Sequence, residues 1–488
     1  MKITKVKCDM TGPKFALISL VVLLAGCSLA PRHEPGQAPI PVSWPTQSEA
    51  DTQVETQGQA LMWTSLVQDQ TALELVELAL ENNRDLRSTL LNIEAARAQY
   101  RIQRSERFPS IGVAAEGGRQ RMPADLSMPG ANAVQSNYTV GLGLSAFEID
   151  LFGRVRNLSE SALQAYLATE EAAKATRLSL IGEVLEAYIT ADSASQRKKL
   201  TQETLATRER SLALIEAQRQ GGTATALDYQ DAVGLTQQAR AELERTDREL
   251  RQARNALAMI VGNSVSRDAI ADRPSTGPIV RGDVRPGLPS DLLQRRPDIR
   301  AAERRLLGSN ANIGAARAAF FPSISLTGTF GTSSAELSGL FDSGSKSWSF
   351  LPQINLPIFN GGQNVANLDL ATVRKDIAVS DYEREIQQAF REVADGLDAK
   401  ETFAREAQAR ADLANSSTEA LRLSEARYRA GVDGFLRYLD TQRSSFADQI
   451  SLINVNAEQQ IATVRLFKAL GGDWDQTPTS TAGIGTDR

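Results

Sequence analysis

The chain has 488 residues, of which 42% are hydrophobic and 23% charged, so its composition is that of a folded protein and not of a disordered tail. Its formal net charge of −5 gives no global reason to bind nucleic acid. His33 is the only histidine, and Cys8 and Cys27 are the only cysteines, which argues against histidine-based catalysis, a disulfide framework and a CxxC zinc site.

The N-terminus has the pattern of a bacterial export signal. Several lysines precede an apolar run at 15–25, which is too short to span a bilayer comfortably. The run ends in Leu-Ala-Gly-Cys at 24–27, which is similar to the lipobox of bacterial lipoproteins. We therefore expect residues 1–26 to be a signal peptide that is cut off, and Cys27 to carry an S-diacylglycerol and an N-acyl chain. The alternative is an ordinary signal peptide with an incidental cysteine.

Residues 27–70 follow the signal peptide. We expect them to form a lipidated tether and then a segment near the equator of the protein. Ser28, in place of aspartate after the cysteine, resembles the sorting signal of lipoproteins of the outer membrane. Residues 28 to about 60 are rich in Pro, Gln, Ser and Thr, and such a composition cannot form a core. No later stretch is apolar for long enough to form a transmembrane helix, so any further crossing of a membrane has to use β-strands.

The remainder of the sequence contains a repeat. Phe-Pro-Ser-Ile at 108–111 returns at 321–324, and Glu-Ala at 216–217 returns at 425–426. A period near 210 is too long for a solenoid and indicates an internally duplicated domain. A proline cluster separates two regions without proline, 130–273 and 358–477. The expected divisions are a first repeat at 71–262, an equatorial connector at 263–297, a second repeat at 298–472 and a tail at 473–488.

Each repeat is predicted to contain three helices in the same order, with Asp298 as an N-cap after Pro297. A helix of about 67 residues would be about 100 Å long, which a compact domain does not need. Apolar residues at steps of three and four predict helices packed side by side, although a coiled-coil dimer would show the same spacing. The expected helices are 72–107, 152–219, 224–261, 299–319, 363–429 and 434–470.

Four segments alternate between apolar residues on one face and small or polar residues on the other. In 138–146, Tyr138, Val140, Leu142, Leu144 and Ala146 share one face. Such a strand faces lipid in a membrane barrel, but a soluble sandwich strand has the same period. Four strands cannot close a transmembrane barrel, and open edges are not tolerated in lipid, so if these strands enter a membrane, several chains have to share a barrel. The expected strands are 110–118, 138–146, 324–332 and 348–358, joined by polar loops at 119–137 and 333–347.

Several segments resemble TolC-type outer-membrane efflux proteins, specifically the OprM-like, NodT-type lipoproteins. They are LPSDLLQRRPDI at 288–299, FFPSI at 320–324, PIFNGG at 357–362 and ARYRAGVD at 426–433. The resemblance runs from Cys27 to about Gly472. It implies an α+β membrane protein, a homotrimer whose 12-stranded outer-membrane β-barrel, four strands per chain, continues into a periplasmic α-helical barrel. It also implies a periplasmic adaptor and an inner-membrane pump, usually of the resistance-nodulation-division (RND) type.

The resemblance also implies a gate. Leu436, Asp440 and Arg443 follow the turn at Gly431 at spacing i, i+4, i+7, on one helix face. The matching positions line the closed periplasmic entrance in OprM-like proteins. Our hypothesis is that three Leu436 side chains form an apolar constriction and three Asp440 side chains an acidic ring that attracts cations. The alternative is a solvated face with an Asp440–Arg443 ion pair. Tyr428 matches a tyrosine that ties the movable helix pair to its neighbours.

Two glycine turns are the predicted tips of the helix pairs, and by resemblance they meet the adaptor. A helix-ending turn alone would also explain the glycines. In this family a basic residue stands near Asp433 in some members, so this sequence departs from that pattern. The tip residues are Gly221, Gly222 and Thr223 in the first repeat and Gly431, Val432 and Asp433 in the second.

The expected function is conduction and not bond chemistry, with no metal and no cofactor. The glycine-rich segment at 339–347 lacks the order and context of a phosphate-binding loop. We expect an outer-membrane channel for small toxic compounds. A type I secretion channel served by an ATP-driven exporter is the alternative, and a structural envelope lipoprotein is a weaker one.

Overall fold

The computed structural model describes residues 28–32, 62–123, 125, 133–262, 277–284 and 289–472. The expected signal peptide, Cys27 and the tail lie outside them. The chain forms two compact units, each described by itself below. Of the described residues, the sheet unit contains those within 28–32, 93–169 and 302–382, and the helical unit contains those within 62–92, 170–301 and 383–472.

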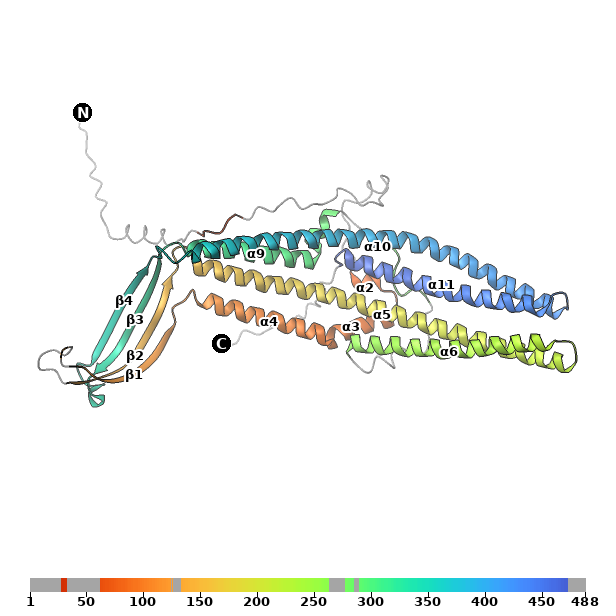
Figure 1. Cartoon of the computed structure of the whole chain (residues 1–488), viewed down its shortest axis with the longest axis horizontal. Helices are drawn as coiled ribbons and strands as arrows, with labels where there is room; N and C mark the ends of the chain where they lie inside the picture. The colour runs from red at the N-terminus through yellow and green to blue at the C-terminus, as the bar shows by residue number, and fades with distance from the viewer. Residues whose placement is uncertain are drawn as a thin grey trace, which may run out of the picture. The chain divides into compact units, whose positions relative to one another are not determined.

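Helices make up most of the described residues, and the four strands form one sheet (Figure 1). The first part of the chain contains α2 Trp63–Leu66, α3 Gln70–Asn82, α4 Arg84–Ser105, β1 Ile111–Arg121, β2 Val134–Ile149, α5 Arg154–Gln220 and α6 Ala226–Val261. The second part contains η2 Pro289–Asp291, α8 Leu292–Arg295, α9 Pro297–Ala318, β3 Ser323–Ser334, η3 Leu337–Gly339, β4 Lys346–Asn355, α10 Gln363–Arg429 and α11 Phe435–Ala469.

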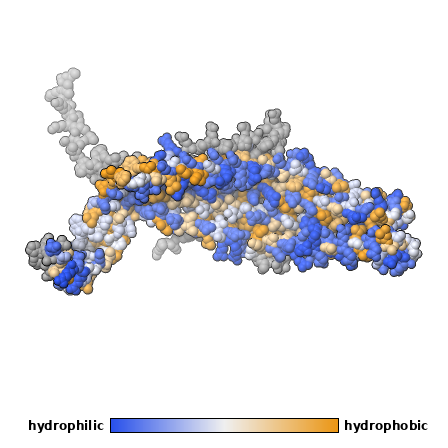
Figure 2. All heavy atoms as spheres, viewed as in Figure 1, coloured by the Kyte–Doolittle hydropathy of each residue, from blue (hydrophilic) through white to orange (hydrophobic). Residues whose placement is uncertain are grey.

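The four strands of the sheet unit are antiparallel neighbours in the order β1-β2-β3-β4. An apolar row crosses all of them, because residues directly opposite in the register lie on the same face. The row consists of Val113, Leu142, Phe330 and Trp348, whose exposed fractions lie between 50% and 77%. The face of the sheet that is visible in Figure 2 is mostly pale, with hydrophilic residues gathered at its far end. Within the described residues β1 and β4 each pair on one side only, so the sheet has two open edges.

The alternation predicted for 138–146 ends earlier than expected. The register between β2 and β3 shifts between Leu144 and Phe147, and Ala146 has φ 45°. Its N–H donates to the Thr327 hydroxyl at 3.2 Å and not to the backbone ladder. A β-bulge of this kind changes which face later residues occupy, so Ala146 does not continue the apolar face.

Elements of the same kind recur at constant spacing along the chain. Helices α4 and α9 have 22 residues each, and α5 and α10 have 67 each. The starts of α4 and α9 are separated by 213 positions, and those of α5 and α10 by 209. These are the offsets at which the sequence motifs return.

The helix predicted at 72–107 is two helices, because Asn83 interrupts it with ψ 129°. Its Oδ1 accepts from the N–H of Leu86 at 2.8 Å, and its Nδ2 donates to the carbonyl of Ile260 at 2.7 Å. Asn83 is therefore the N-cap of α4, and this break was not predicted.

The N-cap predicted at Asp298 is also wrong, because α9 already begins at Pro297. Proline fits the first helical position, where its missing N–H is not needed. The preceding residue, Arg296, takes the position that Asn83 has before α4. Its guanidinium is buried and donates to Asp298, to Glu392 at 2.7 Å and to the carbonyl of Ala469 at 3.0 Å.

The core of the helical unit includes buried side chains of α2, α3, α5 and α6. Its largest fully buried side chains include Leu66, Leu75, Ile181, Leu185 and Ile189. Their burial removes the apolar stripes of these helices from water. Among the described residues, no helix is both long and apolar enough for a membrane span.

Candidate functional site

The two long helix pairs of the helical unit, α5–α6 and α10–α11, end in the same type of turn. Thr223 N–H bonds to the carbonyl of Gln218 at 2.8 Å, and Val432 N–H bonds to that of Arg427 at 2.9 Å. Together with bonds from the preceding glycines, these are Schellman motifs. The residue each motif needs in the left-handed region is Gly222 (φ 75°) and Gly431 (φ 73°). The predicted tips are therefore turns, as expected.

The helices that leave the two tips are capped differently. Thr225 and Asp228 form a capping box at the start of α6. The N-cap of α11 is Gly434, which has no side chain to accept the free N–H groups. Asp433 instead forms two hydrogen bonds with Arg427, at 2.7 and 2.9 Å, and this partner lowers the pKa of its carboxyl group. The N-terminus of α11 is therefore less well capped than the N-terminus of α6.

Tyr428 lies in an aromatic cluster at the base of this tip. Its ring stacks on Tyr438 with centroids 5.7 Å apart and contacts Phe435 at 5.4 Å. Its hydroxyl donates to Oε1 of Gln218 on α5 at 2.7 Å. Burial raises the pKa of the phenol, so it stays protonated and a donor. The sequence pointed to Tyr428 but not to Gln218.

Of the four predicted gate residues, Tyr428 lies in α10, and the other three, Leu436, Asp440 and Arg443, share the exposed face of α11. Leu436 is 61% exposed, although it is a large apolar side chain, and the next buried residues, Tyr438 and Leu439, face the core on the other side. Asp440 and Arg443 form an ion pair at 2.8 Å. The structure thus forms the Asp440–Arg443 ion pair that the alternative hypothesis, a solvated helix face, predicted. A constriction and an acidic ring need further copies and stay predictions.

Polar contacts join α5 to α11 along an antiparallel line, which we call the α5–α11 seam. Glu186 pairs with Arg465 at 2.9 Å, and Arg197 donates to Asn454 at 2.9 Å. Towards the tip, the Arg208 guanidinium lies 5.6 Å from the ring centre of Phe446, and Gln442 donates to Ser211 at 3.4 Å. Sequence reasoning missed this line, because it joins residues more than 200 positions apart.

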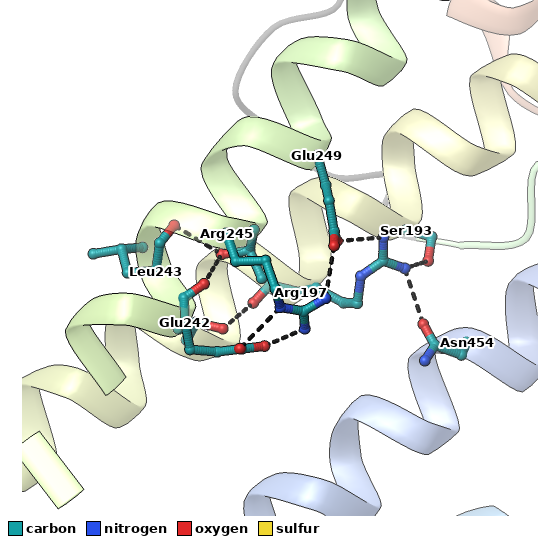
Figure 3. A network of polar contacts seen from close by, with 9 residues as sticks. Ser193, Arg197, Glu242, Leu243, Arg245, Glu249 and Asn454 are labelled. Atoms are coloured by element: carbon teal, nitrogen blue, oxygen red, sulfur yellow. Dashed lines mark hydrogen bonds and ion pairs between the residues drawn. The ribbon is translucent and has the colours of Figure 1, made fainter. Parts of the chain in front are cut away.

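Arg197 is the most connected residue of the α5–α11 seam (Figure 3). Besides Asn454 it bonds to Ser193 on its own helix and to Glu249 on α6. Glu249 also accepts from Arg245, which pairs with Glu242. Arg197 therefore links α5, α6 and α11 and has a carboxylate beside it.

In the sheet unit, the residues that directly follow Cys27 are docked on two helices. Ser28 Oγ donates to Asn157 of α5 at 2.9 Å, and Asn310 of α9 donates to the carbonyl of Pro31 at 2.8 Å. Gly314 makes room for this segment, because a Cβ there would lie 2.8 Å from the backbone nitrogen of Ala30. Cys27 itself lies outside the described residues.

No group of three or more His, Cys, Asp or Glu side chains within the described ranges is placed to hold a metal ion. The predicted gate and tips consist of helix-ending turns, exposed apolar side chains and ion pairs.

Comparisons with known proteins agree with this picture. A family model described as outer membrane efflux protein matches residues 75–263 and 288–472. The outer membrane protein OprJ of Pseudomonas aeruginosa is 55% identical over 472 residues, which cover 96% of this chain and 98% of OprJ. The solvent efflux pump outer membrane protein SrpC of Pseudomonas putida is 45% identical, over 95% of this chain and 98% of SrpC.

A solved structure, the open state of the MtrE outer membrane channel of Neisseria gonorrhoeae, is similar with a TM-score of 0.81 at 38% identity. It matches over 91% of this chain and 98% of MtrE.

Proposed function

We propose a transport function from the premise that this chain belongs to the outer membrane efflux protein family. It is an outer-membrane protein of an efflux system, and we infer that it forms the channel through which compounds leave the cell. The relatives that are named as efflux pump components favour this function over type I secretion and over a structural envelope role.

The observation that carries the proposal is the four-stranded sheet with an exposed apolar row and two open edges. Backbone groups at an open edge cannot remain unpaired in lipid. We infer that three copies join their sheets edge to edge into a 12-stranded barrel, in which the row from Val113 to Trp348 faces lipid. The long helices of the three copies would then form the periplasmic tunnel.

We also infer that the chain arose by internal duplication, and equivalent packing supports this. A Cβ on Gly262 would lie 2.6 Å from the carbonyl oxygen of Asn82, and one on Gly471 would lie 3.1 Å from that of Arg295. Both glycines have positive φ. Gly262 packs against the break before α4, and Gly471 packs against the break before α9. The two glycines are 209 positions apart, and the two breaks are 213 positions apart.

Partners follow from this function. We propose that a periplasmic adaptor contacts the tips at 221–223 and 431–433, and that the adaptor connects the channel to an inner-membrane RND-type pump. The exposed side chain of Val432 and the exposed backbone of the two glycine turns support a docking role. Acyl chains on Cys27 would add an anchor in the outer membrane, next to the docked residues 28–32.

Conductance in planar bilayers tests the proposal. Purified full-length protein should form pores of one unit size, and crosslinking should capture trimers. Protein that stays a water-soluble monomer and conducts nothing in bilayers would refute the channel. A deletion strain challenged with a panel of toxic compounds, together with crosslinks from cysteines at the exposed tip positions Thr223 and Val432, should identify the compounds exported and the adaptor.

A further inference from the structure

Arg208 is the residue of the α5–α11 seam whose charge is not balanced. It is 5% exposed, and one of its terminal nitrogens donates to the carbonyl of Leu235 at 2.9 Å. Its Nε is buried without a hydrogen-bond partner. Within the described part of the chain no carboxylate pairs with it, whereas Glu186 balances Arg465 and Glu249 accompanies Arg197.

On the α11 side this cation faces the ring of Phe446, 5.6 Å away, and the charged group that acts on it, Arg443, has the same sign. An aromatic face attracts a cation, but a desolvated charge costs more than such a contact returns. Arg443 lies one turn from Phe446 on α11 and pairs with Asp440 at the surface. Burial and the charge of Arg443 both hold the pKa of Arg208 below its usual range. Arginine nevertheless stays protonated, so the charge opposes close packing at this level.

The fold itself does not require an arginine here. The equivalent position in α10, 209 residues later, is Ser417, whose hydroxyl bonds within its own helix to the carbonyl of Ala414 at 3.2 Å. Two helices of equal length thus have a buried cation in one case and a small neutral residue in the other. Because a buried unpaired charge destabilises packing, Arg208 needs an explanation other than stability.

We propose that Arg208 is a positioning residue of the gate, which weakens the α5–α11 seam at the level of Arg443 and so lets the α10–α11 tip separate from α5. Separation brings the guanidinium into water and removes the cost of its burial. The contacts of Glu186 and Arg197 with α11 have compensated charges, and they hold the seam above this level. The inference rests on the proposed channel function, and it places the start of gate opening between Arg197 and Arg208.

Single-channel recording of the purified full-length protein in planar bilayers tests this inference. Arg208→Met keeps the length and apolar stem of the side chain but removes the charge. Its open probability should fall about fivefold or more, as expected for a coupling free energy at the lower end of the usual range. Its unit conductance should not change, and its thermal midpoint should stay the same or rise. Arg208→Lys keeps the charge and should remain close to the wild type.

Arg210→Met is the matched control, because Arg210 is exposed on the same helix and bonds only within it. Phe446→Leu gives a second test that does not alter Arg208. Without the ring the cation is less compensated, so the open probability should rise. An Arg208→Met channel that opens as often as the wild type or more often would overturn the inference, as would a fall in Phe446→Leu. A wild-type protein that forms no pores would refute the proposed function itself.

Discussion

The hydroxyl of Tyr428, the last residue but one of α10, is hydrogen-bonded to the side-chain amide of Gln218 near the end of α5, at 2.7 Å. This bond joins the two helix pairs directly behind their tips. Gln218 and Arg208 both lie on α5, but the two residues act in opposite senses on the neighbouring helix pair. The hydrogen bond holds the pairs together, whereas the buried charge pushes them apart.

Tyr428→Phe should therefore favour the open gate. The ring and its stacking on Tyr438 remain, so only the hydrogen bond is lost, and a net bond of this kind contributes about 0.5–1.5 kcal/mol. The open probability in planar bilayers should rise about twofold to twelvefold. Gln218→Ala should have a similar effect, and the double variant should add little to either single one. Additive effects in this cycle would show that the two side chains do not act as a pair.

Asp440→Ala should make the channel leak. The substitution removes the carboxylate from the exposed face of α11 and leaves Arg443 without its ion pair. If three Asp440 side chains form a ring, cation conductance and selectivity should both change. The matched control is Asp231→Ala, because Asp231 is the exposed counterpart of Asp440 at the offset of 209. Equal conductance and cation selectivity in Asp440→Ala and the wild type would exclude the acidic ring.

Local patterns of sequence were sufficient for much of this fold. The alternation from 324 to 332 and the long proline-free stretches predicted the strands and the long helices within a few residues. The breaks at Asn83 and Ala146 were missed for a common reason. Each depends on a side chain or backbone group that is far away in sequence, Ile260 in one case and Thr327 in the other.

The candidate site divides in the same way. The turn glycines are a local signal, so Gly431 could be named from the sequence, whereas Leu436 and Asp440 were named by resemblance to OprM-like proteins. Contacts across the seam are not local, since Gln218 and Arg208 meet residues of α10 and α11 only after the helices pack. The one usable signal for Arg208 was its replacement by Ser417 in the second repeat.

Replacing the tip glycines should loosen the ends of both helix pairs. Gly222 and Gly431 have φ near +75°, and nothing lies within 4 Å of a Cβ at either position, so alanine would cost only backbone strain. That cost is about 1–2 kcal/mol per residue. Amide exchange of the last helical turns should accelerate in Gly222→Ala and Gly431→Ala. Crosslinking to the adaptor should weaken as well.

Gly221→Ala is the control for this experiment. Gly221 precedes the left-handed residue and does not have positive φ, and a Cβ there would make ordinary contact with the carbonyl of Ala217 at 3.5 Å. Its exchange rates should match those of the wild type. If all three variants exchange alike, the left-handed glycines do not set the stability of the tips.

A charge on the apolar row of the sheet should prevent stable insertion into lipid, and the same charge on the other face should not. Phe330 lies in the row between Leu142 and Trp348 and is 67% exposed, whereas the neighbouring Thr329 points to the opposite face and bonds to Ser349. A lysine facing the middle of the bilayer costs about 2–4 kcal/mol. Phe330→Lys should therefore lose stability by this amount per copy, measured by denaturant unfolding in lipid vesicles.

Thr329→Lys should remain close to the wild type, because its side chain would lie in the water-filled interior of the barrel. The two variants place a lysine at adjacent positions of the same strand. Any effect of lysine on the strand that does not depend on the face is therefore the same in both and cancels in the comparison. Equal loss of stability in the two variants would mean that neither face is in contact with lipid. A larger loss in Thr329→Lys would mean that the barrel closes with the row of Phe330 inside, which reverses the assignment of its faces.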